Sequence, residues 1–214
     1  MEKLAISCWN FKGGVGKSVI SLVLSEIAAQ KGLRVLAIDT DEQKNLSSAL
    51  SFIADKFPNL QVKDSLASDD AEQDYELFIV DCRPEMSDTV KKAIHFADII
   101  LVPVMADLFS AANVGAVWQF IQGLDKNRQQ AAMVKNCFDS TVTTREIDGV
   151  LQDQSLPMAG RLPRNANLVR NIVSGRIWSA GMDARQQNPF LHLYSHVWSA
   201  YKKMLTDGFD HPWR

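Results

Sequence analysis

The sequence predicts an α/β fold in which a doubly wound, mostly parallel sheet carries helices on both faces. Short runs rich in Val, Ile and Leu, each bounded by turn residues, alternate with longer stretches of helical period. The runs are continuously apolar rather than alternating, which is typical of strands buried on both faces of a parallel sheet. A chain of 214 residues that is 46% apolar can bury one such domain, which we expect to span residues 1–214.

The expected elements follow one another in chain order. The first strand, residues 4–9, precedes a glycine-rich turn and a helix at residues 17–30, whose apolar residues recur on one side. Four further apolar runs are expected to be strands: 34–38, 77–80, 99–104 and 131–136. Helical stretches such as 107–124 supply the crossovers between parallel strands. Residues 57–74 are polar and acidic, and we expect them to form a surface excursion.

Composition excludes several classes of protein. No apolar run approaches the roughly 18 residues of a membrane span. The first residues, MEKLAISCWNFKGG, lack the charged-then-apolar order of a signal peptide, so we do not expect export. The three cysteines, Cys8, Cys82 and Cys137, are odd in number and far apart. They form neither a disulfide framework nor a CxxC metal site, which suits a reducing cytosol.

The formal net charge of −2 conceals an uneven distribution of charge. Residues 1–160 carry 15 basic and 22 acidic residues, whereas residues 161–214 carry 8 basic and 3 acidic ones. Such asymmetry favours an anionic partner for the last quarter of the chain, although scattered surface charges are the alternative. Five arginines carry most of the excess: Arg161, Arg164, Arg170, Arg176 and Arg185.

The strongest chemical signal is a glycine-rich stretch between the first expected strand and helix. It is Asn10-Phe11-Lys12-Gly13-Gly14-Val15-Gly16-Lys17-Ser18. Glycines let backbone N–H groups close around phosphates, and a following helix N-terminus adds a favourable dipole. Lys17 would reach the β- and γ-phosphates, and the Ser18 hydroxyl would bind Mg²⁺. The strict GxxxxGK[ST] pattern is broken because Phe11 replaces the first glycine. A glycine-rich turn with incidental lysines is the alternative.

This loop resembles the deviant Walker A loop of the ParA/MinD superfamily of P-loop ATPases. Four later segments resemble that family's sequence boxes in the same order: Val35 to Gln43, Tyr75 to Asp81, Ala97 to Pro103, and Leu162 to Asn165. The resemblance spans residue 3 to about residue 175. It implies a P-loop NTPase fold and ATP with Mg²⁺ as cofactors. The implied phosphate-binding residues are Gly13, Gly14, Val15, Gly16, Lys17 and Ser18.

Two aspartates end buried strands at the carboxyl edge of the expected sheet, where ligands bind in such folds. By resemblance, Asp81 is the Walker B aspartate that binds Mg²⁺ with Ser18, and Asp39 supports the metal through water. Asp41 projects the same way as Asp39 if the chain stays extended. It would then orient the attacking water, since phosphoryl transfer depends on placed charges and an oriented nucleophile. A turn or strand-end aspartate is the alternative for Asp39 or Asp81 taken alone.

Lys12 separates the ParA/MinD pattern from ordinary P-loops. The resemblance implies that Lys12 reaches across a nucleotide-sandwich homodimer to the partner's phosphates, which makes hydrolysis depend on dimerisation. Gly13 would permit the close approach of the two subunits. Asn136, at the end of the fifth expected strand, is implied to contact the adenine, and the loop around Pro163 to cover it. An asparagine that only ends a strand is the alternative.

The sequence departs from the family pattern at four positions. Glu42 replaces the usual proline after the D-x-D pair, and Ser18 replaces the commoner threonine. Cys82 and Arg83 stand where the family has T-P before a proline. Serine is equivalent to threonine for Mg²⁺. Arg83 would lie near the γ-phosphate and could alter hydrolysis or the response to a partner.

The prediction that follows is a ParA-type ATPase. By resemblance, its ATP homodimer binds DNA nonspecifically and drives plasmid or chromosome partition, and a ParB-like centromere-binding activator stimulates hydrolysis. The five arginines could neutralise DNA phosphates without reading sequence. We expect the protein to be cytoplasmic and nucleoid-associated, without stable membrane insertion.

Three alternatives stay open. One is a MinD-like membrane-cycling or protein-cargo-positioning ATPase, of which the membrane-cycling kind should present a basic amphipathic helix to lipid. Residues 191–205 are amphipathic but contain only two lysines, so we expect their apolar stripe to pack on the sheet. That stripe is Leu191, Tyr194, Val197, Trp198, Tyr201 and Leu205. A ligase-type enzyme and a nucleotide-binding scaffold with little hydrolysis are the other two.

Overall fold

The computed structural model describes residues 3–67, 74–124, 130–139, 141–152, 157–207 and 213. Across these ranges, seven strands form one sheet in the order β3-β2-β4-β1-β5-β6-β7, and all neighbouring strands are parallel. The predicted α/β, doubly wound fold is therefore confirmed. The strands are β1 (Leu4–Cys8), β2 (Val35–Asp39), β3 (Leu60–Lys63), β4 (Leu77–Asp81), β5 (Ile99–Met105), β6 (Gln130–Asn136) and β7 (Met158–Leu162).

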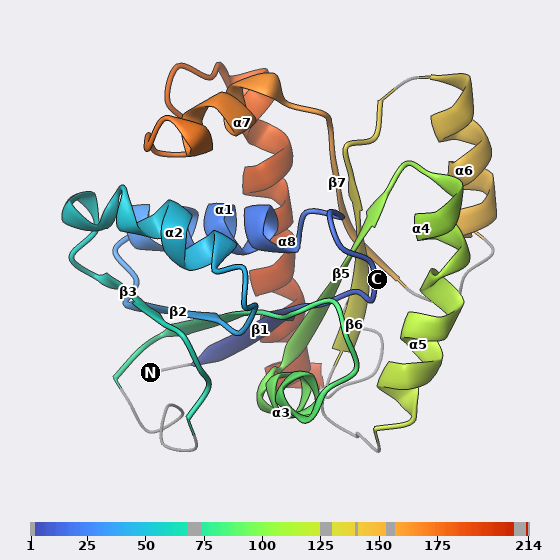
Figure 1. The fold of residues 1–214 in the computed structure, drawn as a ribbon, viewed down its shortest axis with the longest axis horizontal. Coiled ribbons are helices and arrows are strands. Elements are labelled where there is room, and N and C mark those ends of the chain that lie inside the picture. The colour runs from blue at the N-terminus through green and yellow to red at the C-terminus, as the bar shows by residue number, and fades with distance from the viewer. Residues whose placement is uncertain are drawn as a thin grey trace.

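Helices cover both faces of this sheet (Figure 1). One face packs against α1 (Lys17–Gln30), α2 (Asn45–Ser51), α7 (Ala166–Val173) and α8 (Ala184–Asp207). The other packs against α3 (Asp88–Phe96), α4 (Leu108–Ala112), α5 (Val114–Gln122) and α6 (Val142–Gln152). A single 3₁₀ turn in the described residues, η1 (Ala54–Lys56), follows α2.

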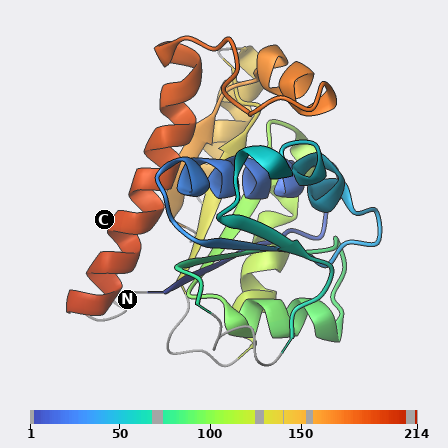
Figure 2. The same cartoon turned by 90° about the vertical axis from the view of Figure 1, so that its left-hand side faces the viewer.

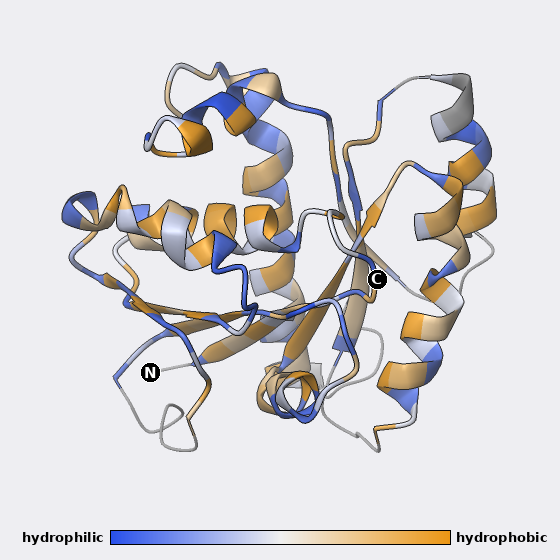
Figure 3. Cartoon of the chain, viewed as in Figure 1, coloured by the Kyte–Doolittle hydropathy of each residue, from blue (hydrophilic) through white to orange (hydrophobic). Residues whose placement is uncertain are grey.

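The two faces of the sheet bury two separate apolar cores. Successive residues of a strand point to opposite faces, so each central strand contributes to both cores. In β1, for example, Leu4 and Ile6 belong to the core under α1 and α8, whereas Ala5 belongs to the core under α3 and α5. Figure 3 shows the central strands coloured toward the hydrophobic end of the scale, as expected for strands covered on both sides.

The central elements lie where the sequence predicts them. The helix at 17–30 coincides with α1, and the five expected strands agree with β1, β2, β4, β5 and β6 to within one residue at each end. These strands are buried along almost their whole length. Continuous apolar sequence therefore identified the strands that have neighbours on both sides.

The two edge strands were not predicted. Residues 57–74 were expected to be a surface excursion, but Leu60–Lys63 forms β3, parallel to β2. Residues 68–73 of that segment lie outside the described residues. Both β3 and β7 lie at the edges of the sheet and mix buried, half-buried and exposed positions, and neither has a continuous apolar run. Their strand character comes from pairing with β2 and β6.

The expected helix at 107–124 is wrong in one respect, because it consists of two helices, α4 and α5, that meet at Asn113. The Asn113 side-chain amide donates a hydrogen bond of 2.9 Å to the backbone carbonyl of Phe109. That carbonyl is the acceptor a continuous helix would use at this position, and asparagine side chains compete for such groups.

The last helix packs its apolar stripe inward, as expected. α8 contacts β7 and α1 and runs along one side of the molecule (Figure 2). Tyr194, Val197 and Tyr201 are buried, but Leu205 is 51% exposed, and Met204 is buried in its place. Seven residues separate Val197 from Met204, which is close to two helical turns. Among the described residues, no helix has both the length and the apolarity needed to cross a membrane.

The strand order changes direction at β1, which lies between β4 and β5. In open α/β sheets, ligands bind beyond the carboxyl ends of the strands at such a switch point. The chain leaves β1 there and enters the glycine-rich loop that leads to α1. The topology therefore places that loop, the ends of β2 and β4, and their following turns at one edge.

Candidate functional site

Glycine conformation and a buried asparagine shape the loop between β1 and α1. Gly14 and Gly16 have φ values of +75° and +98°, in the left-handed region that favours glycine. The Asn10 side chain donates to the carbonyl of Pro103 at 2.8 Å and accepts from the N–H of Lys12 at 3.0 Å. Gly16 is the N-cap of α1 and has no side-chain cap, so the first N–H groups of the helix are left for a ligand at the loop.

The loop opens on a cleft of about 660 Å³, a size typical of small-molecule sites. One wall is the loop and the start of α1; the other is formed by the turns that follow β2 and β4. Six of the predicted site residues line this cleft: Gly13, Gly14, Gly16, Lys17, Ser18 and Asp41. Three residues that were noted only as departures or neighbours in sequence also line it: Glu42, Gln43 and Arg83.

Lys17 is a buried cation at the base of the loop. It is 6% exposed, and its ammonium group donates to the carbonyl of Lys12 at 3.1 Å. Burial lowers the pKa of Lys17, while the carboxylates of Asp81 and Asp41 act in the opposite direction. The bond to the Lys12 carbonyl therefore holds the Lys17 ammonium group against the glycine-rich loop.

Asp81 is a fully buried carboxylate near Ser18 and Lys17. It is fully buried at the end of β4, and neither oxygen has a donor in hydrogen-bond geometry among the described residues. Burial raises the pKa of Asp81 to about 7, although the nearby Ser18 hydroxyl and Lys17 ammonium lower it. An unpaired buried carboxylate is costly unless a cation satisfies it.

The residues present fit a Mg²⁺ ion. Asp81 would supply the carboxylate and Ser18 the hydroxyl, both of them oxygen ligands that Mg²⁺ prefers. The described residues hold no group of three or more His, Cys, Asp or Glu that could bind a metal. Mg²⁺ at nucleotide sites is commonly held by one or two protein ligands together with phosphate oxygens and water.

Asp39 lies beside Asp81, but its carboxylate already accepts two backbone hydrogen bonds. The two residues are paired across β2 and β4 in the sheet register. The Asp39 carboxylate accepts N–H groups from Asp41 at 3.2 Å and from Ser47 at 2.8 Å. It therefore fastens the turn after β2 to the start of α2, and its predicted part in the metal shell stays a prediction.

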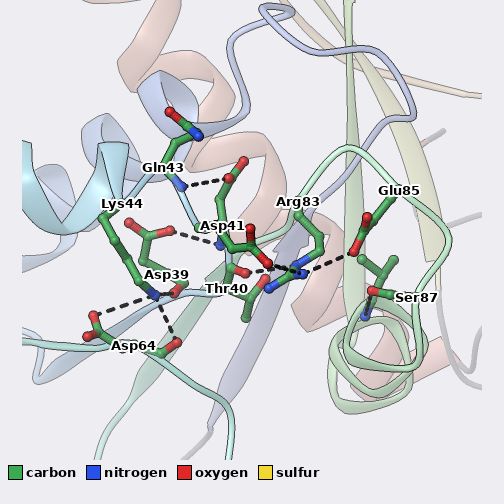
Figure 4. A network of polar contacts seen from close by, with 11 residues as sticks. Asp39, Thr40, Asp41, Gln43, Lys44, Asp64, Arg83, Glu85 and Ser87 are labelled. Atoms are coloured by element: carbon green, nitrogen blue, oxygen red, sulfur yellow. Dashed lines mark hydrogen bonds and ion pairs between the residues drawn. The ribbon is translucent and has the colours of Figure 1, made fainter.

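Asp41 reaches the cleft through a turn rather than through extended chain. The extended segment on which the prediction for Asp41 depended is not present, because residues 41–43 bend and the N–H of Lys44 donates to the carbonyl of Asp41 at 3.1 Å. The Asp41 carboxylate accepts the N–H of Gln43 at 3.0 Å, as Figure 4 shows. The turn places this carboxylate on the wall opposite Lys17 and Ser18.

Lys12 is paired within its own chain. Its ammonium group lies 2.5 Å from an Asp107 carboxylate oxygen and 3.0 Å from the Ser110 hydroxyl, and 6.0 Å from the centre of the Phe109 ring. Partial burial opposes ionisation of Asp107, but hydrogen bonds from Lys12 and Ser110 lower its pKa overall. Sequence reasoning missed Asp107 and Ser110. The Asp-x-x-Ser spacing identifies a helix cap, and nothing in it points to Lys12.

Asn136 supports the loop from the end of β6. Its side-chain amide donates to the carbonyl of Val15 at 2.9 Å. A Cβ on Gly16 would lie 2.1 Å from the same amide nitrogen, and the φ of +98° also favours glycine at that position. Pro163 is partly buried after β7 and is not among the cleft-lining residues. The adenine contacts predicted for Asn136 and Pro163 stay predictions.

With this geometry established, comparison with known proteins identifies the family. The model of the CobQ/CobB/MinD/ParA nucleotide-binding domain matches residues 6–177. The chain belongs to this family. The matched region includes the loop, the cleft, Asp39, Asp81 and Asn136. The resemblance to the ParA/MinD superfamily is therefore confirmed.

Individual members of the family resemble the chain over different lengths. The chromosome-partitioning ATPase Soj of Thermus thermophilus is 23% identical over 186 residues, which covers 69% of this chain and 75% of that protein. A protein named replication protein A in Rhizobium rhizogenes is 51% identical over 43 residues, only 20% of this chain and 11% of that protein.

A solved structure extends the likeness of fold to nearly the whole chain. It is a plasmid partition protein from Borrelia burgdorferi B31 bound to AMPPNP. The TM-score is 0.77 at 16% sequence identity, covering 94% of this chain and 100% of that one. At this identity the comparison supports the family fold and says nothing about individual side chains.

Proposed function

We propose that the chain is a Mg²⁺-dependent ATPase whose ATP-bound homodimer binds DNA nonspecifically and drives plasmid or chromosome partition. A ParB-like activator would stimulate hydrolysis and so release the DNA. The observation that carries the proposal is the loop itself, in which Lys17 lines the cleft and its ammonium group bonds to the backbone of a second lysine, Lys12. The family match and the partition proteins among the relatives support this choice.

Each residue at the cleft has a definite task in this proposal. The loop N–H groups and Lys17 would hold the triphosphate, because their charge and dipoles face the cleft. Ser18 and Asp81 would hold Mg²⁺, which when bound neutralises charge on the β- and γ-phosphates. Asp41 would orient the attacking water from the opposite wall. Lys12 would leave Asp107 and Ser110 to reach the partner's phosphates.

Exposed arginines near the C-terminal end of the described chain supply a surface for DNA phosphates. All five arginines singled out in sequence are exposed: Arg161, Arg164, Arg170, Arg176 and Arg185. Arg161 differs in that it pairs with Asp148 at 2.7 Å and lies 5.4 Å from the centre of the Phe138 ring. We therefore assign DNA binding to the other four arginines and not to Arg161.

The buried stripe of α8 favours DNA over lipid as the cellular surface. A helix that lies on a membrane needs an apolar face available to the lipid. In α8 that face is occupied by contacts with the core through Tyr194, Val197 and Tyr201. The MinD-like alternative would require this helix to leave the sheet.

DNA binding measured without nucleotide, with ADP and with ATP tests the proposal. We expect binding to random-sequence duplex only with ATP, and weakening steeply with salt because of counterion release. The double variant Arg170→Gln/Arg176→Gln should lower the salt slope by about two, since each phosphate contact contributes roughly one. Arg34→Gln is the matched control, because Arg34 precedes β2 at the end of that strand away from the cleft. This variant should leave the salt slope unchanged.

Two results would contradict parts of the proposal. Intact ATP hydrolysis with no DNA binding in any nucleotide state would exclude the partition mechanism and favour a membrane or protein cargo. Lys12→Ala should keep ATP binding and lose the ATP-induced dimer, measured by sedimentation. A stable ATP dimer of that variant would exclude the cross-dimer role of Lys12.

A further inference from the structure

Arg83 joins the two turns that form one wall of the cleft. Its Nε donates to the carbonyl oxygen of Thr40 at 3.1 Å. Its Nη1 donates to carboxylate oxygens of Glu42 and Glu85, each at 3.1 Å. Thr40 and Glu42 follow β2, whereas Arg83 and Glu85 follow β4. Figure 4 shows the guanidinium group lying between these two turns.

In the turn after β2, the groups that Arg83 binds belong to the residues on either side of Asp41. Thr40 contributes its backbone carbonyl, and Glu42 contributes its side chain. Asp41 lies between them, with its own N–H bonded to Asp39. Arg83 therefore ties the residue before Asp41 and the residue after it to the turn that follows β4.

The charges around Arg83 favour a role in holding the turn after β2 over a role in binding an anionic ligand. Two carboxylates, Glu42 and Glu85, already lie against its single positive charge. Glu42 is largely exposed, and an exposed ion pair alone contributes little. Arg83 is only 25% exposed, and it adds a bond to a backbone carbonyl, so the planar guanidinium is fixed in three directions.

Glu42 and Arg83 are also two of the positions at which the sequence departs from the family pattern. They are 41 residues apart in sequence and directly bonded in the structure. Prolines at the same positions could make no such ion pair. The two departures therefore form one contact, at the turn that carries Asp41.

We propose that Arg83 is a positioning residue that holds Asp41 toward the cleft through Thr40 and Glu42. The rate of hydrolysis then depends on Arg83, whereas the affinity for nucleotide does not. This rests on the proposed function, because Asp41 orients water only if the chain hydrolyses ATP. Glu85 holds the guanidinium from its own turn and serves the same arrangement.

Arg83→Gln tests the proposal by separating kcat from binding. We expect kcat to fall about tenfold to a hundredfold, since small displacements of a reacting group have effects of this size. The Kd for AMPPNP should change by no more than about twofold, because an interaction used only in the transition state is lost. Arg34→Gln is the control, since Arg34 also joins a backbone carbonyl and a carboxylate, on Asp74, but lies at the other end of β2.

Two further variants identify which bonds matter. Glu42→Gln should lower kcat less than Arg83→Gln, because the bond from Arg83 to the Thr40 carbonyl persists. Arg83→Lys should not restore the rate, because one ammonium group cannot reproduce the forked geometry. A wild-type rate for Arg83→Lys would mean that charge alone matters and would overturn the positioning role.

Hydrogen exchange gives a readout that does not need activity. The amides of residues 40–44 should exchange faster in Arg83→Gln than in the wild type or Arg34→Gln. Unchanged exchange there would overturn the proposal, as would a loss of AMPPNP affinity as large as the loss of kcat. If the wild type hydrolyses no ATP, the proposed function fails, and the rate dependence proposed for Arg83 fails with it. The exchange result then still decides whether Arg83 holds the turn.

Discussion

Asp81 and Glu26 are both fully buried carboxylates, and burial raises the pKa of each to about 7. They lie in different regions of the molecule. Asp81 ends β4 at the cleft, whereas Glu26 lies in the middle of α1, against the segment between α7 and α8. The same residue chemistry and the same burial therefore occur in the site and in the scaffold.

Their hydrogen bonds differ. Neither oxygen of Asp81 has a donor in hydrogen-bond geometry among the described residues. One oxygen of Glu26 accepts the backbone N–H of Trp178 at 2.9 Å, 152 residues away in sequence. A buried carboxylate beside a phosphate loop and without donors is suited to a cation, whereas one that accepts a distant backbone N–H ties two segments together. Burial alone does not distinguish function from structure; the partners do.

The largest expected effect comes from Asp81→Asn. If Asp81 serves the metal, hydrolysis should fall roughly a hundredfold or more, because a fixed charge at the phosphates is lost. The free energy of unfolding without nucleotide should not decrease, since an unpaired buried charge is replaced by a neutral amide. Steady-state hydrolysis and urea unfolding measure the two.

Asp88→Asn on the exposed surface of α3 is the control for both measurements. A large loss of stability in Asp81→Asn, with hydrolysis preserved, would mean that Asp81 has a structural role, as Glu26 does, and does not serve the metal.

Substitutions of Glu26 should affect stability and leave nucleotide binding intact. Glu26→Ala leaves the buried N–H of Trp178 without an acceptor, which should lower the free energy of unfolding by about 1–3 kcal/mol. Glu26→Gln keeps an acceptor and should cost less than Glu26→Ala. Urea unfolding of the two variants measures the difference. Equal losses in both would mean that the contact with Trp178 does not account for the effect.

Glu26 should also make the free energy of unfolding depend on pH. Burial raises its pKa from 4.5 to about 7, so the folded state retains a proton that the unfolded chain has lost. The contribution of Glu26 to stability is therefore fully present below pH 4.5 and is lost as the pH rises to about 7. The slope is at most about 1.4 kcal/mol per pH unit for one group.

Glu26→Gln provides the matched comparison for this slope, since the amide does not titrate. Unfolding free energies of the wild type and the variant should converge or cross as the pH rises. Parallel pH profiles would show that Glu26 titrates alike in both states. The charge of Lys56 also lowers the pKa of Glu26. The unfolding free energy of Lys56→Met should therefore fall slightly more steeply with pH than that of the wild type.

The sequence by itself determined the centre of this protein. Central strands of a sheet that is covered on both sides need apolar residues on both faces. The sequence shows this as continuous apolar runs in β1, β2, β4, β5 and β6. The loop from Asn10 to Ser18 was equally visible, because its glycines and lysines must be adjacent in the chain to surround a phosphate. The positions of Asp39 and Asp81 followed, since both end such strands.

Only the tertiary structure decided the edges and the partners. β3 and β7 are strands because each pairs with a neighbouring strand. Their residues are partly exposed, so their sequence carries no continuous apolar run that would predict a strand. Lys12 and Asp107 are 95 residues apart, and Glu42 and Arg83 are 41 apart. Local sequence specifies conformation over a few residues, whereas a contact across such separations depends on how the whole sheet and its turns are assembled. For that reason the sequence located the site, and the fold determined which charges in it are paired.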